Sequence, residues 1–268
     1  MDIIIKELKL EKAKSVKTPG EEEKNQEGDE EELGPMEATS YRGMSARANY
    51  LAQDRMDIQY AVKEISREMA KPTRGGMRKL KRLGRYLVGK PRVVTEYPWQ
   101  EEGKNIKGYS DSDWGGCKKT GKSTSGGVIL KGGHYIRSWS STQKCVTLSS
   151  GEAELVAMVK TSAEVIGVAQ LLADWGEEVE GEVLVDSSAA LGVVKRKGCG
   201  KLRHVRVGKL WIQEKEETGE LKYNKVRGLA NPADMGTKHL NEKKIRQYMK
   251  DIGQAELEGR AQESLKIA

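Results

Sequence analysis

The amino-acid sequence predicts an α/β protein in which a mixed sheet is flanked by helices, with a helical segment ahead of it. Three observations lead to this fold class. Short β-rich segments separated by glycine follow one another from residue 106. A long helical pattern comes next, and strands then alternate with helices up to about residue 240. Because a meander pairs antiparallel and strand–helix alternation favours parallel pairing, the sheet should contain both kinds.

The first hundred residues precede the strands. Residues 1–40 include the acidic run "EEEKNQEGDEEELG", which lacks apolar periodicity and predicts a disordered linker. Residues 41–100 are expected to be helical, since apolar residues recur at helical spacing over 41–70. A second helix over 76–88 carries leucines at positions 80, 83 and 87.

Five strands are expected further along the chain. The segments "NIKGYSDSDW", "TSGGVILKG" and "HYIRSWSS" form the meander. The segment "LSSGEAELVAMVKTSAEVIGVAQLLADW" places apolar residues along one helical stripe, and Ser149 with Glu152 is a candidate capping box at its start. The strands "EVLVDS" and "ELKYNKV" follow, with helices between and after them. Residues 241–268 are expected to form a helical tail.

Composition narrows the class of protein. Cys117, Cys145 and Cys199 are widely spaced in a chain without a secretory signal, which predicts reduced thiols in an intracellular protein, cytoplasmic or nuclear. No apolar run approaches the roughly 20 residues needed to cross a bilayer, so no membrane partner is expected. The histidines lie too far apart for a zinc site of standard spacing.

Acidic residues stand at the ends of the predicted strands. In "GYSDSDWGG", Asp111 and Asp113 share one face of a strand, where they could bind a cation or simply form a polar strand end. Asp186 ends a second strand, and ligands of open α/β sheets gather at strand ends, so it could meet Asp111 there. Glu154, in the first turns of the long helix, could face the sheet. Asp234 opens a later helix, where it could also stabilise the helix dipole.

The formal net charge of +7 is concentrated in two basic blocks. Residues 71–92 hold nine Lys or Arg and no acid, and residues 195–209 hold seven and no acid. Such blocks are either the footprint of a polyanionic partner or solvated helix faces. The residues expected to contact nucleic acid are Arg78, Lys79, Lys81, Arg82, Arg85, Lys195, Arg196 and Arg203.

The order of these motifs resembles the ribonuclease H domain of copia-type retrotransposon polyproteins. The resemblance covers about residues 108–240 and is carried by "YSDSDWGG", "KSTSGGVIL", "SWSSTQKCVTLSSGEAEL", "VLVDSSAAL" and "ANPADMGTKHL". Upstream, "YRGMSARANYLAQDRMDIQYAVKEISREMAKPT" is similar to the segment that joins reverse transcriptase to that nuclease. The resemblance implies a ribonuclease H-like domain over residues 104–240, behind a connection segment over residues 41–100.

The resemblance also implies an activity, the cleavage of the RNA strand of RNA/DNA hybrids. Asp111, Glu154, Asp186 and Asp234 match the four carboxylates of the family, whereas Asp113 matches a non-catalytic position. Two Mg²⁺ ions, with Mn²⁺ as the alternative, are then expected between these carboxylates. A reverse transcriptase is a second expected partner beside the hybrid.

Two features depart from the family pattern. The segment "KVRGLANPAD" lacks the histidine that many cellular ribonucleases H carry before the last acid, and the chain has no Asp-Asp pair of the polymerase type. DNA synthesis by this chain is therefore not expected. The main alternative to the nuclease is a catalytically inactive, nucleic-acid-binding retrotransposon relic. An integrase-like strand-transfer core would share the fold but not the order of the motifs.

Overall fold

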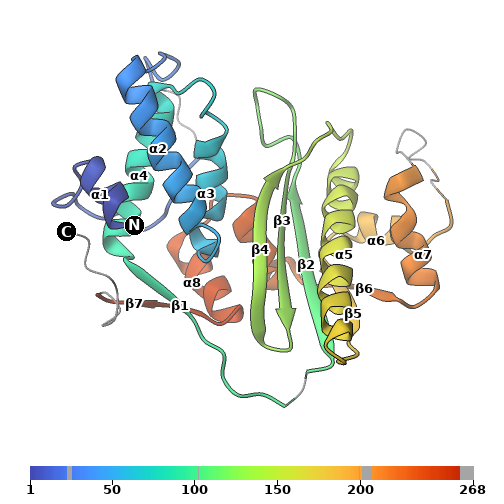
Figure 1. Ribbon diagram of the computed structural model, residues 1–268. Helices are drawn as coiled ribbons and strands as arrows, with labels where there is room; N and C mark the ends of the chain where they lie inside the picture. The colour runs from blue at the N-terminus through green and yellow to red at the C-terminus, as the bar shows by residue number, and fades with distance from the viewer. Residues whose placement is uncertain (23–25, 102, 199, 201–206, 260–268) are drawn as a thin grey trace. The chain divides into compact units, whose positions relative to one another are not determined.

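The computed structural model describes residues 1–22, 26–101, 103–198, 200 and 207–259 (Figure 1). The chain divides into two compact units. Residues 1–96, 239–250 and 254–268 belong to the first, which we call the helical unit. Residues 97–238 and 251–253 form the second, which we call the sheet unit.

The helical unit is built on a cluster of buried apolar side chains. Its helices are α1 (Asp2–Glu7), α2 (Pro35–Leu51), α3 (Met56–Ser66), α4 (Arg74–Gly89) and α8 (Glu242–Asp251). The predicted leucine stripe of α4 lies in the core of this unit. Thr73 caps α4 by accepting a hydrogen bond from the Gly76 amide at 3.1 Å, which satisfies one of the free amides of the first turn.

Two terminal segments differ from the sequence prediction. Within residues 1–40, predicted to be disordered, α1 is helical because Ile4 and Leu8 are buried in the apolar cluster of the helical unit. Residues 241–268, predicted to be a helical tail, contain α8 and then a strand, β7 (Gln254–Leu257). This strand pairs antiparallel with β1 (Arg92–Thr95), a distant segment that was expected to be helical. The residues of neither segment indicate that it pairs with the other.

The sheet unit contains the predicted mixed sheet. Its strands are β2 (Asn105–Asp113), β3 (Thr124–Lys131), β4 (His134–Thr142), β5 (Glu180–Val185) and β6 (Leu221–Lys225), in the order β4-β3-β2-β5-β6. The meander β2-β3-β4 is antiparallel, whereas β5 pairs parallel with both β2 and β6. The α/β fold with a mixed five-stranded sheet flanked by helices is therefore confirmed.

The long helix α5 (Ser150–Asp174) packs against β2, β3 and β5, along one side of the sheet in Figure 1. Ser149 accepts a hydrogen bond from the Glu152 amide, as the predicted capping box requires. Gly108 allows the helix to approach β2 closely, since a Cβ there would lie 2.6 Å from Cγ2 of Val165. By length and composition α5 could also cross a membrane, but its buried side chains, including Leu155 and Met158, belong to the core of this unit.

The remaining elements of the sheet unit follow the parallel strands. Helix α6 (Ser188–Val194) comes after β5, and α7 (Trp211–Glu217) comes before β6. Two 3₁₀ turns, η2 (Gly228–Ala230) and η3 (Pro232–Gly236), then bring the chain back to the central strand β2, because η3 contacts β2, β3 and β4.

Candidate metal centre

The register of the sheet places the first two predicted acids side by side. Strand β2 lies between β3 and β5, and Asp111 near its end is only 3% exposed. In the parallel pairing of β2 with β5, Ser110 lies opposite Val185. The next residue on each strand is then an aspartate, Asp111 on β2 and Asp186 directly after β5. This arrangement confirms the sequence argument that the two strand ends meet.

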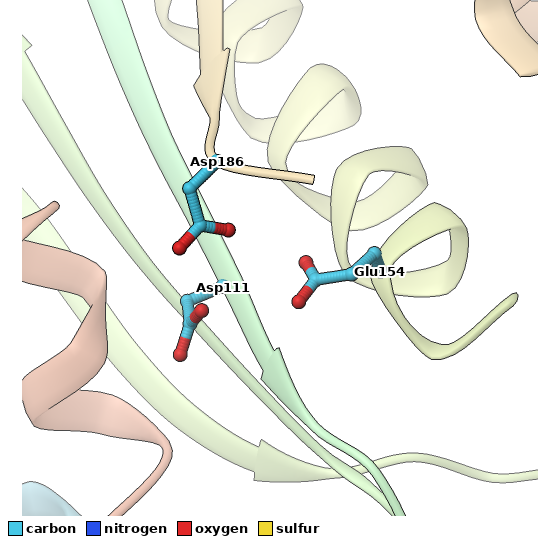
Figure 2. Close-up of side chains that lie close together, drawn as sticks. All are labelled: Asp111, Glu154 and Asp186. Carbon is cyan, nitrogen blue, oxygen red and sulfur yellow. The ribbon is translucent and has the colours of Figure 1, made fainter. Parts of the chain in front are cut away.

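Helix α5 supplies the third carboxylate. Glu154 lies in the second turn after the cap at Ser149 and is 8% exposed. Figure 2 shows its carboxylate directed toward those of Asp111 and Asp186. One oxygen from each of the three side chains lies within 4.8 Å of the others. Asp111, Glu154 and Asp186 are called the carboxylate triad below.

Asp234 lies on η3, which is fixed to the central strand by hydrogen bonds. The Asn231 side-chain amide donates to the Ser110 carbonyl oxygen at 2.9 Å, and its oxygen accepts from the Ala233 amide at 3.3 Å. A Cβ at Gly126 would lie 2.6 Å from the Ala233 carbonyl oxygen, so glycine on β3 is what permits this close approach. Asp234 therefore lies beside the triad, but it is not one of the three acids whose ligand oxygens lie within 4.8 Å of one another.

Two residues that sequence reasoning missed connect Asp234 to Asp111. The Thr237 hydroxyl donates a hydrogen bond to Oδ2 of Asp111. Nζ of Lys238 lies 2.7 Å from Oδ1 of Asp234 and 4.0 Å from Oδ2 of Asp111. A signal was present in "ADMGTK", where Lys238 follows Asp234 by four residues, a spacing at which opposite charges pair on a helical turn.

Asp113 has a different role, although it lies only two residues from Asp111. Its Oδ1 accepts a hydrogen bond from the Thr124 amide, at the start of the neighbouring strand. A Cβ at Gly116 would overlap the Asp113 carboxylate, so this turn also depends on glycine. Asp113 holds the β2–β3 connection and is not part of the described acidic cluster.

Crowding of acids in the interior raises the pKa of every member of the triad. Burial, followed by the charges of Asp111 and Asp186, raises the pKa of Glu154 to about 8. Burial and the Asp234 charge raise the pKa of Asp186. The pKa of Asp111 is also raised by burial, although the Lys238 charge opposes the shift. Without a bound cation, the ionised forms of the three carboxylates are therefore disfavoured in the folded protein.

The donor set fits a hard divalent cation. All three triad side chains offer carboxylate oxygens, the ligands that Mg²⁺ and Mn²⁺ prefer. Oε2 of Glu154 is buried and has no hydrogen-bond partner among the described residues, which is costly unless a cation or water satisfies it. A bound cation would also stabilise the ionised carboxylates, which burial and the neighbouring charges disfavour.

The basic residues predicted on α4 are largely engaged within the helical unit. Three of them pair with acidic side chains, in the pairs Arg78–Asp29, Lys79–Glu68 and Arg82–Glu21. Arg85 donates to the Lys14 carbonyl oxygen at 2.8 Å, and Lys81 is exposed. A phosphate that approached this helix would have to displace at least some of these partners. The contact with nucleic acid thus stays a prediction for all five.

The second basic block follows α6. Lys195 lies at the end of that helix, with its Nζ 3.9 Å from Oε1 of Glu216. Arg196 comes next, and its guanidinium lies close to Gly200. Arg203 falls outside the described residues. Contact between this block and nucleic acid also remains a prediction.

Comparison with known proteins finds sequence relatives over most of the chain. No protein-family model matches it. The chain is 32% identical over 221 residues to the retrovirus-related Pol polyprotein from transposon RE1 of Arabidopsis thaliana, an alignment that covers 80% of this chain and 15% of the polyprotein. It is also 32% identical over 211 residues to the Pol polyprotein from transposon TNT 1-94 of Nicotiana tabacum, covering 78% and 16%. The chain thus spans about one sixth of the length of these curated relatives.

Similarity to solved structures was also found. A ribonuclease H1 isolated from compost by a metagenomic approach is 18% identical, with a TM-score of 0.33 over 55% of this chain and 99% of that one. The likeness in sequence is carried by the Pol polyproteins, whose alignments span both described units. Over about four fifths of its length, the chain is homologous to the retrovirus-related Pol polyproteins of copia-type transposons.

Proposed function

We propose that this chain is a metal-dependent endoribonuclease that cleaves the RNA strand of RNA/DNA hybrids. The observation that carries the proposal is the carboxylate triad, in which two buried acids from β2 and α5 and a partly buried acid at the end of β5 converge, and one buried oxygen of Glu154 has no hydrogen-bond partner among the described residues. Three converging carboxylates with raised pKa values are typical of a site built around a cation. The order of the ribonuclease H motifs adds the reaction class.

Two different sets of carboxylates would hold the two ions. Asp111, Glu154 and Asp186 would hold one Mg²⁺ or Mn²⁺ ion, and Asp111 with Asp234 would offer oxygens to the second ion that the resemblance implies. Such ions, when bound, activate a water and stabilise the leaving oxygen of a phosphodiester. The hydrogen bond from Thr237 fixes one oxygen of Asp111 and thereby orients the carboxylate that both positions share.

The surface next to the triad is suited to a nucleic acid. Trp114, three residues beyond Asp111, is 58% exposed, and its Nε1 donates to the Thr147 carbonyl oxygen at 3.1 Å. That hydrogen bond joins the two loops that precede β3 and α5. Lys118, Lys119 and Lys144 on these loops are exposed. Basic side chains bind phosphates without reading sequence, and an exposed aromatic face can stack on a base or sugar.

The partners follow from this activity. An RNA/DNA hybrid arises during reverse transcription, so a reverse transcriptase remains a proposed partner, and the site of action would be inside the cell. Recognition of the RNA strand would depend on its 2′-hydroxyl groups, which DNA lacks. The proposal therefore requires that a DNA duplex with the same sequence is not cut.

Incubation of the purified chain with an end-labelled RNA/DNA hybrid tests the proposed function. We expect cleavage of the RNA strand in Mg²⁺ or Mn²⁺ and none after addition of a chelator. A matched DNA duplex and single-stranded RNA serve as controls and should remain intact. Hybrid binding without any cleavage in either metal would contradict the nuclease and would favour the inactive binding relic.

A further inference from the structure

Lys238 faces two acids of the centre, one from the triad and one from η3. Its Nζ is 2.7 Å from Oδ1 of Asp234 and 4.0 Å from Oδ2 of Asp111. The side chains of Asp111 and Asp234 are 4% and 6% exposed, whereas that of Lys238 is 50% exposed. A single ammonium group thus lies beside two buried carboxylates while its stem remains accessible to solvent.

The acids of the centre can accordingly be divided into two sets that share Asp111. The triad is one set, and among the described residues Lys238 approaches it at Asp111, with Nζ 4.0 Å from Oδ2. Asp111 and Asp234 form the other set, and Lys238 already contributes a positive charge there. Oδ2 of Asp111, the oxygen that faces Lys238, also accepts the hydrogen bond from Thr237. The second set therefore has a basic side chain in direct contact with Asp234, whereas Glu154 and Asp186 of the first set have no ion pair among the described residues.

We propose that the Lys238 ammonium occupies the second cation position of this centre, so that the chain without substrate binds one divalent ion at the triad and excludes another. This inference rests on the proposed function, because it concerns the ions of the same site. Two cations a few ångströms apart repel strongly in a buried site, so an ion and the ammonium cannot share the Asp111–Asp234 pair. The half-exposed, flexible lysine stem allows the ammonium to move away when a second ion displaces it.

Removal of the lysine charge tests the inference through metal binding, independently of cleavage. The variant Lys238→Met keeps most of the side-chain stem and deletes the charge. Lys225→Met is the matched control, because Lys225 also acts electrostatically on Asp186 but donates its hydrogen bond to Ser188, at 2.6 Å. Binding of Mn²⁺ to the full chain is measured by calorimetry, and the spacing of bound ions by electron paramagnetic resonance.

We expect one Mn²⁺ per chain for the unchanged protein and for Lys225→Met. Lys238→Met should bind two, with the second ion held about tenfold or more tightly than in the unchanged protein because a competing charge is gone. Two ions about 4 Å apart should also give a spin-coupled spectrum. Lys238→Gln should give the same result, and circular dichroism checks that each variant is folded.

The inference and the proposed function fail in different ways. One ion in both Lys238 variants, or two ions of similar affinity in the unchanged protein, would overturn the role of Lys238. If the unchanged protein still cleaves the hybrid in that case, the proposed function stands. If the unchanged protein binds no ion and leaves the hybrid intact, both are wrong.

Discussion

At the scale of single residues, Glu154 shows the energetic cost of the centre most clearly. Burial and two neighbouring acids raise its pKa to about 8 from an ordinary value of 4.5. The folded chain therefore binds this proton more tightly than the unfolded chain does. Linkage then requires the contribution of Glu154 to the stability of the metal-free protein to fall as the pH rises from about 4.5 to about 8. A cation that binds the ionised triad should offset this loss.

The variant Glu154→Gln tests this pH dependence. With a chelator present, the melting temperature of the unchanged protein should fall between pH 5 and pH 9 more steeply than that of the variant, since glutamine has no proton to lose. Below about pH 4.5 both side chains are neutral, so the two proteins should differ least there. If the melting temperatures of the two proteins change equally with pH across this range, then ionisation of Glu154 does not destabilise the folded protein.

The residues also show how far sequence alone can reach. Asp111 and Asp186 could be placed together because parallel strands of a sheet end at a common edge. Glu154 could be assigned to the same edge from the capping box and the apolar stripe of its helix. Lys238 could have been found from its spacing to Asp234, whereas Thr237 was missed because its partner Asp111 lies 126 positions away in the chain. A hydrogen bond of that kind depends on the tertiary fold, which local spacing does not reveal.

At the scale of elements, the acidic segment before α2 is bound to the basic helix α4. Besides the pairs made by Glu21 and Asp29, Glu31 and Glu32 pair with basic residues at or just before the start of α4. The prediction of disorder considered composition alone, in which the segment has no apolar face to bury. A basic helix supplied the opposite charge, and this partner could not be inferred from the segment itself.

Neutralising the acidic segment tests whether α4 binds the hybrid. Most of these ion pairs are at least partly exposed, and water and salt weaken such pairs, so a phosphate can compete with them. The combined variant Asp29→Asn, Glu31→Gln and Glu32→Gln should bind the hybrid more tightly. Its plot of log affinity against log salt should steepen by about one unit for each additional phosphate that a basic side chain neutralises.

A second triple variant separates this effect from net charge. Replacing Glu7, Glu11 and Glu37 with glutamine changes the formal charge equally, at side chains outside the α4 pairs. We expect this control to resemble the unchanged protein in both affinity and salt slope. If the two triple variants behave alike, α4 is a solvated face and the hybrid binds elsewhere.

At the scale of the whole molecule, the types of the elements and the mixed pairing of the sheet were more predictable than the boundaries of the units. The five strands of the sheet unit and helix α5 each have local signals, namely alternation, glycine punctuation and an N-cap. The pairing of β1 with β7 has no local signal of this kind, because all residues of the sheet unit lie between the two strands in the sequence. The helical unit consequently contains residues from both ends of the chain. A prediction that divides the sequence into consecutive domains cannot describe such a unit.

The central claim for the whole molecule is that metal held by the triad cuts the RNA strand of a hybrid. The most direct measurement compares single-turnover cleavage in Mg²⁺ by Asp186→Asn and Asp113→Asn, two variants that each delete one negative charge from the sheet unit. Asp186→Asn should lose activity by orders of magnitude because it removes a metal-binding oxygen. Asp113→Asn should cleave at nearly the unchanged rate, because asparagine can still accept the hydrogen bond from Thr124. Equal rates for the two variants would contradict the account.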